Sequence, residues 1–430
     1  MMFKEKKLDA GRDKNEFLNT RQEFIPDLSK RNRKAKIWKN IFRVSTVIGI
    51  IFLTLLLVKI SNDSFGYVAL EYEINPEALS INGIPLEELP REEYVRILEE
   101  NLTKGRLRTL NKEQPLNERN SADLYNLVVE EVVELKVART WNLYSSLFHE
   151  QEIENYVNEN LPDAKLEFRR WLNKSFITSP QSSDALYAGI RTAILGSLWI
   201  ISIAMLVAFP MGIGAAIYLE EYAKGKESLI NRTIQVNINN LAGVPSIIYG
   251  ILGLAVFVRS LEPLTSGSIF GVVDPTTANG RTIFAAGLTM ALLILPVIII
   301  NAQEAIKAVP NSLREASYGL GGTKWQTVWH HVLPNAIPGI LTGTILSLSR
   351  VIGETAPLIV IGASTYIVYD PTSIFSKFTT LPIQIYQWTA RPQAEFRNIA
   401  AAAIITLLII LLSINALAIY LRNRYSGRLS

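Results

Sequence analysis

Long apolar stretches alternate with polar segments along this chain. Each stretch approaches or exceeds the roughly 20 apolar residues that an α-helix needs to cross the hydrocarbon core of a bilayer. Several contain proline or glycine, which membrane helices tolerate because neighbouring helices or waters satisfy the freed backbone groups. The pattern therefore predicts an all-α polytopic membrane protein with six transmembrane helices, over residues 41–60, 187–219, 236–258, 282–300, 337–361 and 399–420.

Basic residues gather beside these stretches. The net charge of +4 is too small to indicate a nucleic-acid partner, so their placement is the informative feature. By the positive-inside rule, the first cluster places the N-terminus in the cytoplasm, and the later clusters place the C-terminus there as well. The clusters are Arg31, Arg33, Lys34, Lys36 and Lys39; Lys224, Lys226 and Arg232; Lys307, Arg314 and Lys324; and Arg422, Arg424 and Arg428, whereas Arg259, Arg281 and Arg391 fall on the outer side.

The polar segment 61–183 is expected to be a small extracytoplasmic domain. Apolar residues recur at helical spacing from Leu124 to Leu135, and a second amphipathic helix is predicted to begin after Pro90. Such stripes usually indicate core packing, with docking of a partner protein as the functional alternative. The stretch from Lys165 to Leu172 fits an amphipathic segment along the outer membrane interface.

The predicted organisation divides the chain into five parts. They are a cytoplasmic tail at 1–36, a first transmembrane helix at 37–60, the extracytoplasmic domain at 61–183, a membrane core at 184–422 and a cytoplasmic tail at 423–430.

A first motif lies on the cytoplasmic side between the fourth and fifth predicted spans. Asn311 or Ser312 is expected to cap a short helix, and glycines that follow it permit the backbone to turn. Proline suits the first turn of the next helix, where its missing N–H would be unpaired anyway. The motif residues are Glu315, Ala316, Ser317, Gly321, Leu333 and Pro334.

A second motif places two charges in the fifth predicted span. Arg350 and Glu354 are four residues apart and share one helix face, followed by Thr355, Ala356 and Pro357. A charge near the bilayer centre costs roughly 2.5–3.5 kcal/mol on insertion scales, so the pair requires a hydrated or partnered setting. Two interpretations stay open: a passive intrahelical ion pair, or contact with a translocated solute.

These motifs resemble those of a known transporter family. The first resembles the cytoplasmic coupling loop of ABC importer permeases, and the second resembles the Arg-x-x-Gly-Glu-Thr-Ala-Pro signature of the phosphate-specific PstA type. The resemblance continues from Ala188 onward, with Ser317 and His331 as departures. It implies a MetI-like permease core at 184–422, with the coupling loop near 304–334.

The resemblance also implies a function and a set of partners. We expect a permease subunit of an ATP-driven importer of inorganic phosphate in a bacterial cytoplasmic (inner) membrane. The partners would be a PstC-like permease, two PstB-like ATPase subunits, a PstS-like phosphate-binding protein and the lipid bilayer, with no nucleic acid. Alternatives are an importer of another oxyanion, molybdate or sulfate, or a membrane component that senses phosphate.

Residue roles follow from the same resemblance. Arg350 would offer a planar fork of donors to an oxyanion, and the Glu354 carboxylate would accept a hydrogen bond from the proton that phosphate retains near neutral pH and sulfate lacks. Small residues let helices approach closely within lipid. The substrate path is assigned to Arg350, Glu354 and Thr355, ATPase coupling to the first motif, and helix packing and gating to Gly212, Gly214, Gly243, Pro245, Gly353 and Pro357.

The sequence shows no G-x-x-x-x-G-K-[ST] nucleotide motif. ATP and Mg²⁺ are therefore expected to act in the partner ATPase, and we expect no cofactor, metal or catalytic residue in this chain. His330 and His331 are adjacent, so on a helix they point about 100° apart and do not converge on one metal.

Overall fold

The computed structural model of the chain describes residues 28–81, 83–113, 115–223, 229–272, 280–363 and 366–426. It divides into two compact units, residues 1–59 and residues 60–430. Most of the tail predicted at 1–36, half of that predicted at 423–430, and Lys224 and Lys226 lie outside the described residues.

The first unit consists of one long helix that continues into the second unit. Helix α2 runs from Leu28 to Asp63, so it contains the predicted span 37–60 and extends beyond both of its ends. Its large apolar side chains are exposed around the helix. This exposure suits a helix surrounded by lipid, and α2 is long and apolar enough to cross a bilayer from Asn32 to Asp63.

A small antiparallel sheet follows α2. Strands β1 (Phe65–Tyr72), β2 (Leu135–Thr140) and β3 (Lys165–Arg170) lie in the order β2-β1-β3. The stretch Lys165–Leu172, suggested as an amphipathic segment along the membrane interface, forms an edge strand instead of an isolated segment, because β3 pairs with β1 from Phe65↔Arg170 to Leu70↔Lys165. Leu135, expected in a helical stripe, lies in β2 instead.

Short helices surround this sheet. Helix α3 (Arg91–Asn101) begins directly after Pro90, as predicted, and buries Tyr94, Ile97 and Leu98. Asn120 caps the next amphipathic helix by accepting the Asp123 N–H. The remaining elements are η1 (Pro76–Leu79), η2 (Leu86–Glu88), α4 (Lys104–Glu113), η3 (Leu116–Glu118), α5 (Ser121–Val128), the π-helical turn η4 (Val129–Val133), α6 (Leu143–Phe148), α7 (Glu150–Asn160) and α8 (Lys174–Thr178).

The sheet and the membrane core share one hydrophobic cluster. Val68, Leu70 and Trp171 pack in the same cluster as Trp388 and Phe396. This common core explains why segments 61–183 and 184–422 belong to a single compact unit. A mainly helical protein with a small sheet results, and the sheet is the part that the all-α prediction did not include.

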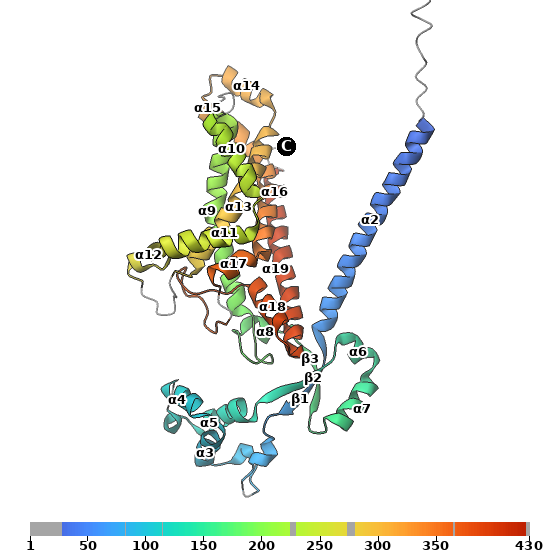
Figure 1. Cartoon of the computed structure of the whole chain (residues 1–430), viewed down its shortest axis with the longest axis vertical. Coiled ribbons are helices and arrows are strands. Elements are labelled where there is room, and N and C mark those ends of the chain that lie inside the picture. The colour runs from blue at the N-terminus through green and yellow to red at the C-terminus, as the bar shows by residue number, and fades with distance from the viewer. Residues whose placement is uncertain are drawn as a thin grey trace, which may run out of the picture. The chain divides into compact units, whose positions relative to one another are not determined.

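Long apolar helices form the membrane core (Figure 1). Among the described residues, five helices are long and apolar enough to span a bilayer, or six if a bent pair counts as one span. Beyond α2 they are α9 (Arg191–Ile217) with the π-helical turn η5 (Tyr218–Tyr222), α13 (Ile283–Lys307), α15 (Lys324–Thr327) continuing through η8 (Val328–Val332) into α16 (Leu333–Gly353), and α19 (Ala394–Ser426).

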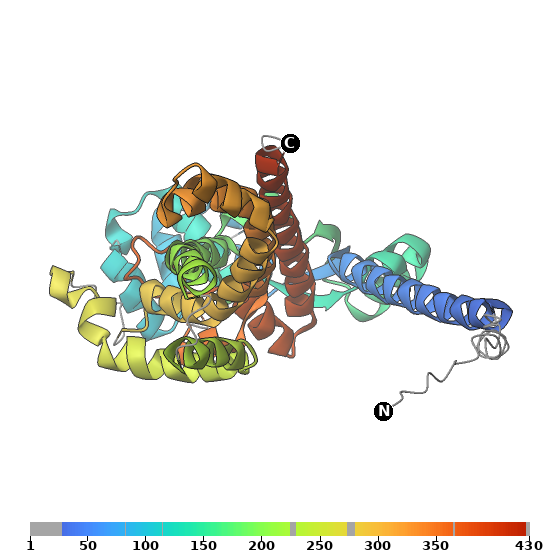
Figure 2. The same cartoon turned by 90° about the horizontal axis from the view of Figure 1, so that it is seen from above.

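The bent pair replaces the straight span predicted at 236–258. Helix α10 (Leu229–Ala242) and helix α11 (Ser246–Gly253), which the π-helical turn η6 extends from Leu254 to Ser260, meet at 107°. Gly243 and Pro245 lie in the break, where proline supplies no N–H for continuing the helix. Figures 1 and 2 show α11 lying across the other helices.

The span predicted at 337–361 is also broken. Helix α16 ends at Gly353, Glu354 is extended, and the short helix α17 (Ala356–Ile361) follows. Proline at the start of α17 explains the restart, since it is tolerated in a first helical turn. The remaining elements are α12 (Glu262–Thr265), η7 (Ser268–Phe270), α14 (Asn311–Gly319) and α18 (Leu381–Ala390).

Helix α13 is the buried helix against which the others pack. A methyl group at Gly212 of α9 would lie 2.6 Å from Ile298 Cγ2 on α13, and one at Gly343 of α16 would lie 2.3 Å from Asn301 Cβ. These contacts require the bare backbone of glycine, because helix association within lipid depends on close packing.

We predict that Gly212→Ala lowers the thermal unfolding midpoint of the purified protein, because the added methyl overpacks the α9–α13 contact by about 1–3 kcal/mol. Gly214→Ala is the matched control, two residues away, with no atom within 4 Å of the added methyl. Equal midpoints for the two variants would contradict the packing described here.

Candidate functional site

A hairpin of two short helices joins α13 to α16. Helix α14 ends at Gly319, and Gly321 adopts a φ of +83°, a left-handed conformation that favours glycine. The Ser317 and Thr327 hydroxyls then share a hydrogen bond of 2.8 Å across the hairpin, and both residues are buried. This bond gives Ser317 a structural role at the position where the resemblance leads one to expect alanine.

One expectation about this hairpin needs correction, and a second is confirmed. Neither Asn311 nor Ser312 caps α14, because Pro310 occupies the N-cap position and no side chain caps the helix. Pro334 lies in the first turn of α16, as expected, and α15, η8 and α16 together form one helical run from Lys324 to Gly353. The π-helical turn η8 ends at Val332, two residues before Pro334.

The outer face of α14 is available to a partner. Glu315 and Ala316 are exposed, Leu320 is 92% exposed, and Trp325 stacks on Trp329 with ring centroids 5.4 Å apart. Leu333 packs instead against the cluster formed by α13 and α16. The hairpin thus has a fixed inner side and an apolar outer side.

A buried ion pair joins the hairpin to the end of α9. Arg314 Nη2 lies 2.7 Å from Glu221 Oε1, and Nε donates to the same oxygen at 3.0 Å. The guanidinium also donates to the Val309 and Ile306 carbonyls, at 2.7 and 3.0 Å. Because the two side chains are only 14% and 7% exposed, this pair fixes α14 to both α9 and α13.

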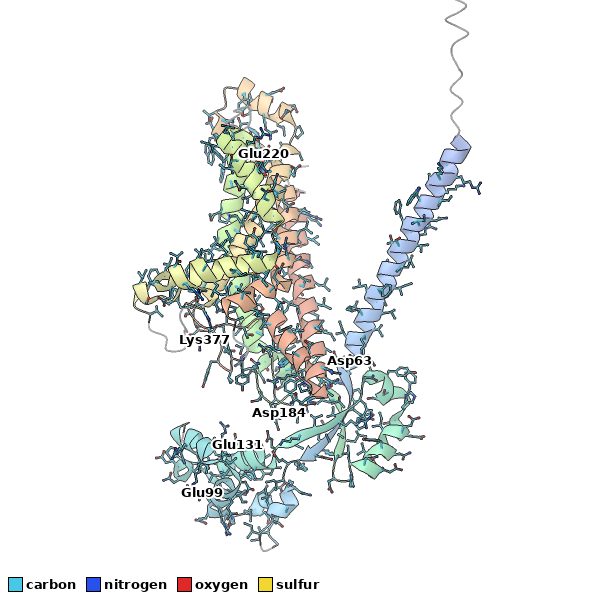
Figure 3. The ribbon with its side chains drawn as sticks, in the orientation of Figure 1. Asp63, Glu99, Glu131, Asp184, Glu220 and Lys377 are labelled. Atoms are coloured by element: carbon cyan, nitrogen blue, oxygen red, sulfur yellow. The ribbon has the colours of Figure 1, made fainter. Side chains whose placement is uncertain are left out.

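A second, weaker set of charges lies beside this pair. Lys307 lies 2.9 Å from Glu304 and 3.4 Å from Glu220. Figure 3 labels Glu220 at this end of the core, opposite the end that carries Asp184. Lys307 is far more exposed than Arg314, so solvent screening leaves little energy in its ion pairs.

Arg350 and Glu354 form an ion pair at the end of α16. Arg350 Nε lies 3.3 Å from Glu354 Oε1, and the side chains are 40% and 19% exposed. Arg350 belongs to the last helical turn, whereas Glu354 is already extended. Thr355 follows in the break, half-buried, and its side chain makes no capping bond to α17.

The depth of this pair follows from the packing of α16 on α13. Gly339 of α16 lies against Ala305, and Gly343 lies against Asn301, so the two helices run antiparallel. Two further turns place Arg350 beside Ile294, at the middle of the 25-residue helix α13. The charge pair is therefore at the mid-depth of the membrane core.

The cavity that Glu354 borders is small. It encloses about 10 Å³ between α9, α16 and α18, about the space of one water molecule. Arg350 presents its exposed surface to the outside of the chain.

The glycines and prolines assigned to packing and gating separate into three groups. Gly212 and Pro357 make close contacts: Pro357 Cα would lie 2.6 Å from a methyl on Gly250. Gly243 and Pro245 lie in the break between α10 and α11. Gly214 and Gly353 do not pack against another helix of this chain, because a methyl at either position would meet nothing within 4 Å.

Reasoning from the sequence missed the Arg314–Glu221 pair and the Ser317–Thr327 bond. In the sequence, Arg314 served only as one of the basic residues that indicate the cytoplasmic side. Glu221 is 93 residues away from it, so no local pattern relates the two. The capping box of Thr323 and Gln326 was detectable, because Thr-x-x-Gln is the usual pattern of such a box. Within the described ranges, no cluster of three metal-ligating side chains is present.

These features define a multi-pass membrane protein with a hairpin of two short helices at one end of its core and a charge pair at mid-depth. Comparison with known proteins extends this result. Residues 208–427 match the family "Binding-protein-dependent transport system inner membrane component", which covers about half of the chain. The chain therefore belongs to this family, and the resemblance predicted from the motifs is confirmed.

Curated relatives are similar to the same half of the chain. "Phosphate transport system permease protein PstA 1" of Mycobacterium tuberculosis is 38% identical over 236 residues, covering 54% of this chain and 70% of the relative. "Phosphate transport system permease protein PstA" of Yersinia pestis is 32% identical over 55% and 74%. "Probable ABC transporter permease protein YqgI" of Bacillus subtilis is 32% identical over 54% and 76%.

Membership assigns the chain its general role. It is an inner-membrane, multi-pass permease of an ABC transporter, which assembles with ATPase and binding-protein subunits. The hairpin between α13 and α16 is the candidate coupling element, and the Arg350–Glu354 pair at the end of α16 is the candidate contact with the transported solute.

We predict that Arg314→Ala loosens the attachment of the hairpin to α9 and α13. Removing one partner of a buried ion pair costs about 3–5 kcal/mol, so α14 should exchange its backbone amide hydrogens faster and ATP-driven uptake should fall severalfold. Hydrogen exchange over residues 311–319 and uptake by the reconstituted complex measure the two effects.

Lys307→Ala is the control, because it removes a cation from the same end of the core but from an exposed pair. Unchanged exchange of α14 in Arg314→Ala would show that the Glu221 link does not fix the hairpin.

Proposed function

We propose that this chain is one of two permease subunits of an ATP-driven importer of inorganic phosphate. The observation that carries this proposal is the Arg350–Glu354 pair, half-exposed at the mid-depth of the core and adjoining a helix break. Relatives that bear phosphate-transport names support the choice of phosphate over molybdate or sulfate.

Arg350 supplies the binding group in this proposal. Its guanidinium presents several N–H donors in a plane, which match the oxygens of a tetrahedral oxyanion in a two-point contact. In the present geometry the 3.3 Å contact with Glu354 uses only Nε, so other donors of the guanidinium remain for a solute. The passive ion pair is then the resting state of the site.

Glu354 supplies selectivity in this proposal. Phosphate retains a proton near neutral pH and donates a hydrogen bond to the carboxylate, whereas sulfate has no proton to donate. The same carboxylate repels a fully ionised anion and keeps binding weak enough for release. Thr355, in the break beside Glu354, would offer its hydroxyl to the same path.

The second half of the path belongs to a partner permease. The cavity beside Glu354 is too small for phosphate, and Arg350 opens to the outside of the chain. A PstC-like subunit facing Arg350 would complete the path, and a PstS-like binding protein would deliver the anion from the side of segment 61–183.

Coupling residues on the hairpin would meet the ATPase. Glu315 and Ala316 form the exposed face of α14 beside Leu320, while Ser317, Gly321, Leu333 and Pro334 hold its fold. Two PstB-like subunits would bind ATP and Mg²⁺ and move the hairpin. This arrangement puts both termini in the cytoplasm of a bacterium, in agreement with the basic clusters beside the spans.

We predict that Arg350→Lys lowers phosphate uptake by tenfold or more while the complex still assembles. Charge is retained, but the planar two-point contact, worth about 1.5–3 kcal/mol, is lost. Uptake of labelled phosphate into vesicles containing the reconstituted complex measures the change. Arg259→Lys, an exposed position on η6, serves as the control, and normal uptake by Arg350→Lys would favour the passive ion pair.

We predict that Glu354→Gln weakens discrimination between phosphate and sulfate severalfold. The amide still accepts a hydrogen bond, but it also donates and carries no charge, so a fully ionised anion is no longer disfavoured. Competition of sulfate against labelled phosphate measures this effect. Normal phosphate uptake together with unchanged sulfate exclusion would remove Glu354 from the selectivity mechanism.

A further inference from the structure

Helix α6 has its polar and apolar sides reversed relative to an ordinary surface helix. Ser146 is buried at 3% exposure, and its hydroxyl accepts the Tyr67 N–H at 2.8 Å. Tyr144, Leu147 and Phe148 are exposed by 59%, 64% and 70%. Because these three occupy positions i, i+3 and i+4, they form one apolar face turned away from the protein.

One hydrogen bond joins α6 to the end of α2, and a second joins that end to α19. The Tyr144 N–H donates to Asn62 Oδ1 at 2.7 Å, one residue before the end of α2. Asn398 Nδ2, near the start of α19, donates to the Asp63 carbonyl at 2.6 Å. Helix α6 therefore begins at the ends of two transmembrane helices, where Figure 3 labels Asp63.

We propose that α6 is a membrane anchor whose Tyr144, Leu147 and Phe148 enter the boundary between headgroups and acyl chains, in the leaflet that faces segment 61–183. This interaction surface is independent of the transported substrate. It assigns to α6 the interfacial contact that the sequence suggested for Lys165–Leu172, which forms β3.

Two observations select lipid as the occupant. The Tyr144 N–H bond to Asn62 and the Asn398 bond to the neighbouring Asp63 carbonyl hold the start of α6 close to the start of the transmembrane helix α19, and aromatic side chains are favoured at this depth. The apolar face also ends abruptly at the acidic start of α7, where Glu150 accepts a hydrogen bond from the Tyr67 hydroxyl. The apolar side chains thus meet lipid while the carboxylates stay in water.

The natural absence of cysteine makes a direct test possible. Leu147→Cys in the full chain, purified with its partners and reconstituted in lipid nanodiscs, is labelled with a nitroxide. Collision of the label with oxygen, which concentrates in lipid, is compared with collision with a water-soluble nickel chelate. We expect the Leu147 label to favour oxygen over the nickel chelate.

Ile84→Cys is the matched control. Ile84 is an exposed apolar residue. It lies near Tyr72, because its neighbour Pro85 and Tyr72 line the same cavity. Tyr72 ends β1, whose eight residues lead about 25 Å away from the end of α2. Its label should favour the water-soluble chelate.

Two outcomes would overturn the proposal. Equal accessibility of the Leu147 and Ile84 labels to the chelate would place α6 in water, and exclusion of both reagents from the Leu147 label would place it under a protein partner. Phe148→Cys is the second labelling position if Leu147→Cys does not fold, and the same outcomes apply to it.

Discussion

Close packing on α13 is the interaction on which the rest of this permease depends. Helices α9, α11 and α16 approach it through Gly212, Gly253 and Gly343, and any added methyl there would lie within 2.2–2.6 Å of an atom of α13. Within lipid the hydrophobic effect contributes little to helix association, so such van der Waals contacts supply much of the packing energy. A movement of α13 must therefore move its neighbours with it.

The two functional regions lie along this packed unit. At one end, Arg314 connects the hairpin to α9 through Glu221 and to α13 through carbonyl groups. At mid-depth, α16 breaks next to Arg350 and Glu354. Because helix α16 continues from the hairpin without interruption, a displacement of α14 reaches the charge pair through one rigid element. Under the proposed function, this connection would link ATPase work to the opening of the ion pair.

The sequence predicted the features that are set by local chemistry. Apolar length located the spans, Pro90 marked the start of α3, and the glycines after α14 marked its turn. The breaks at Gly243–Pro245 and Glu354 were not predicted, because proline and glycine also occur inside the continuous helices α9 and α13, as at Pro210 and Pro296. Strand β3 was missed since Lys165–Arg170 alternates weakly and fits an interfacial segment equally well. The Arg314–Glu221 pair depends on tertiary proximity alone.

In the proposed function, Arg350 breaks its contact with Glu354 and binds an oxyanion in a path shared with a second permease. A high-resolution structure of the assembled transporter, trapped with phosphate in an occluded state, tests it most directly. The account predicts guanidinium nitrogens of Arg350 within hydrogen-bonding distance of two phosphate oxygens. A phosphate bound elsewhere in the path, with the Arg350–Glu354 pair intact, would contradict it.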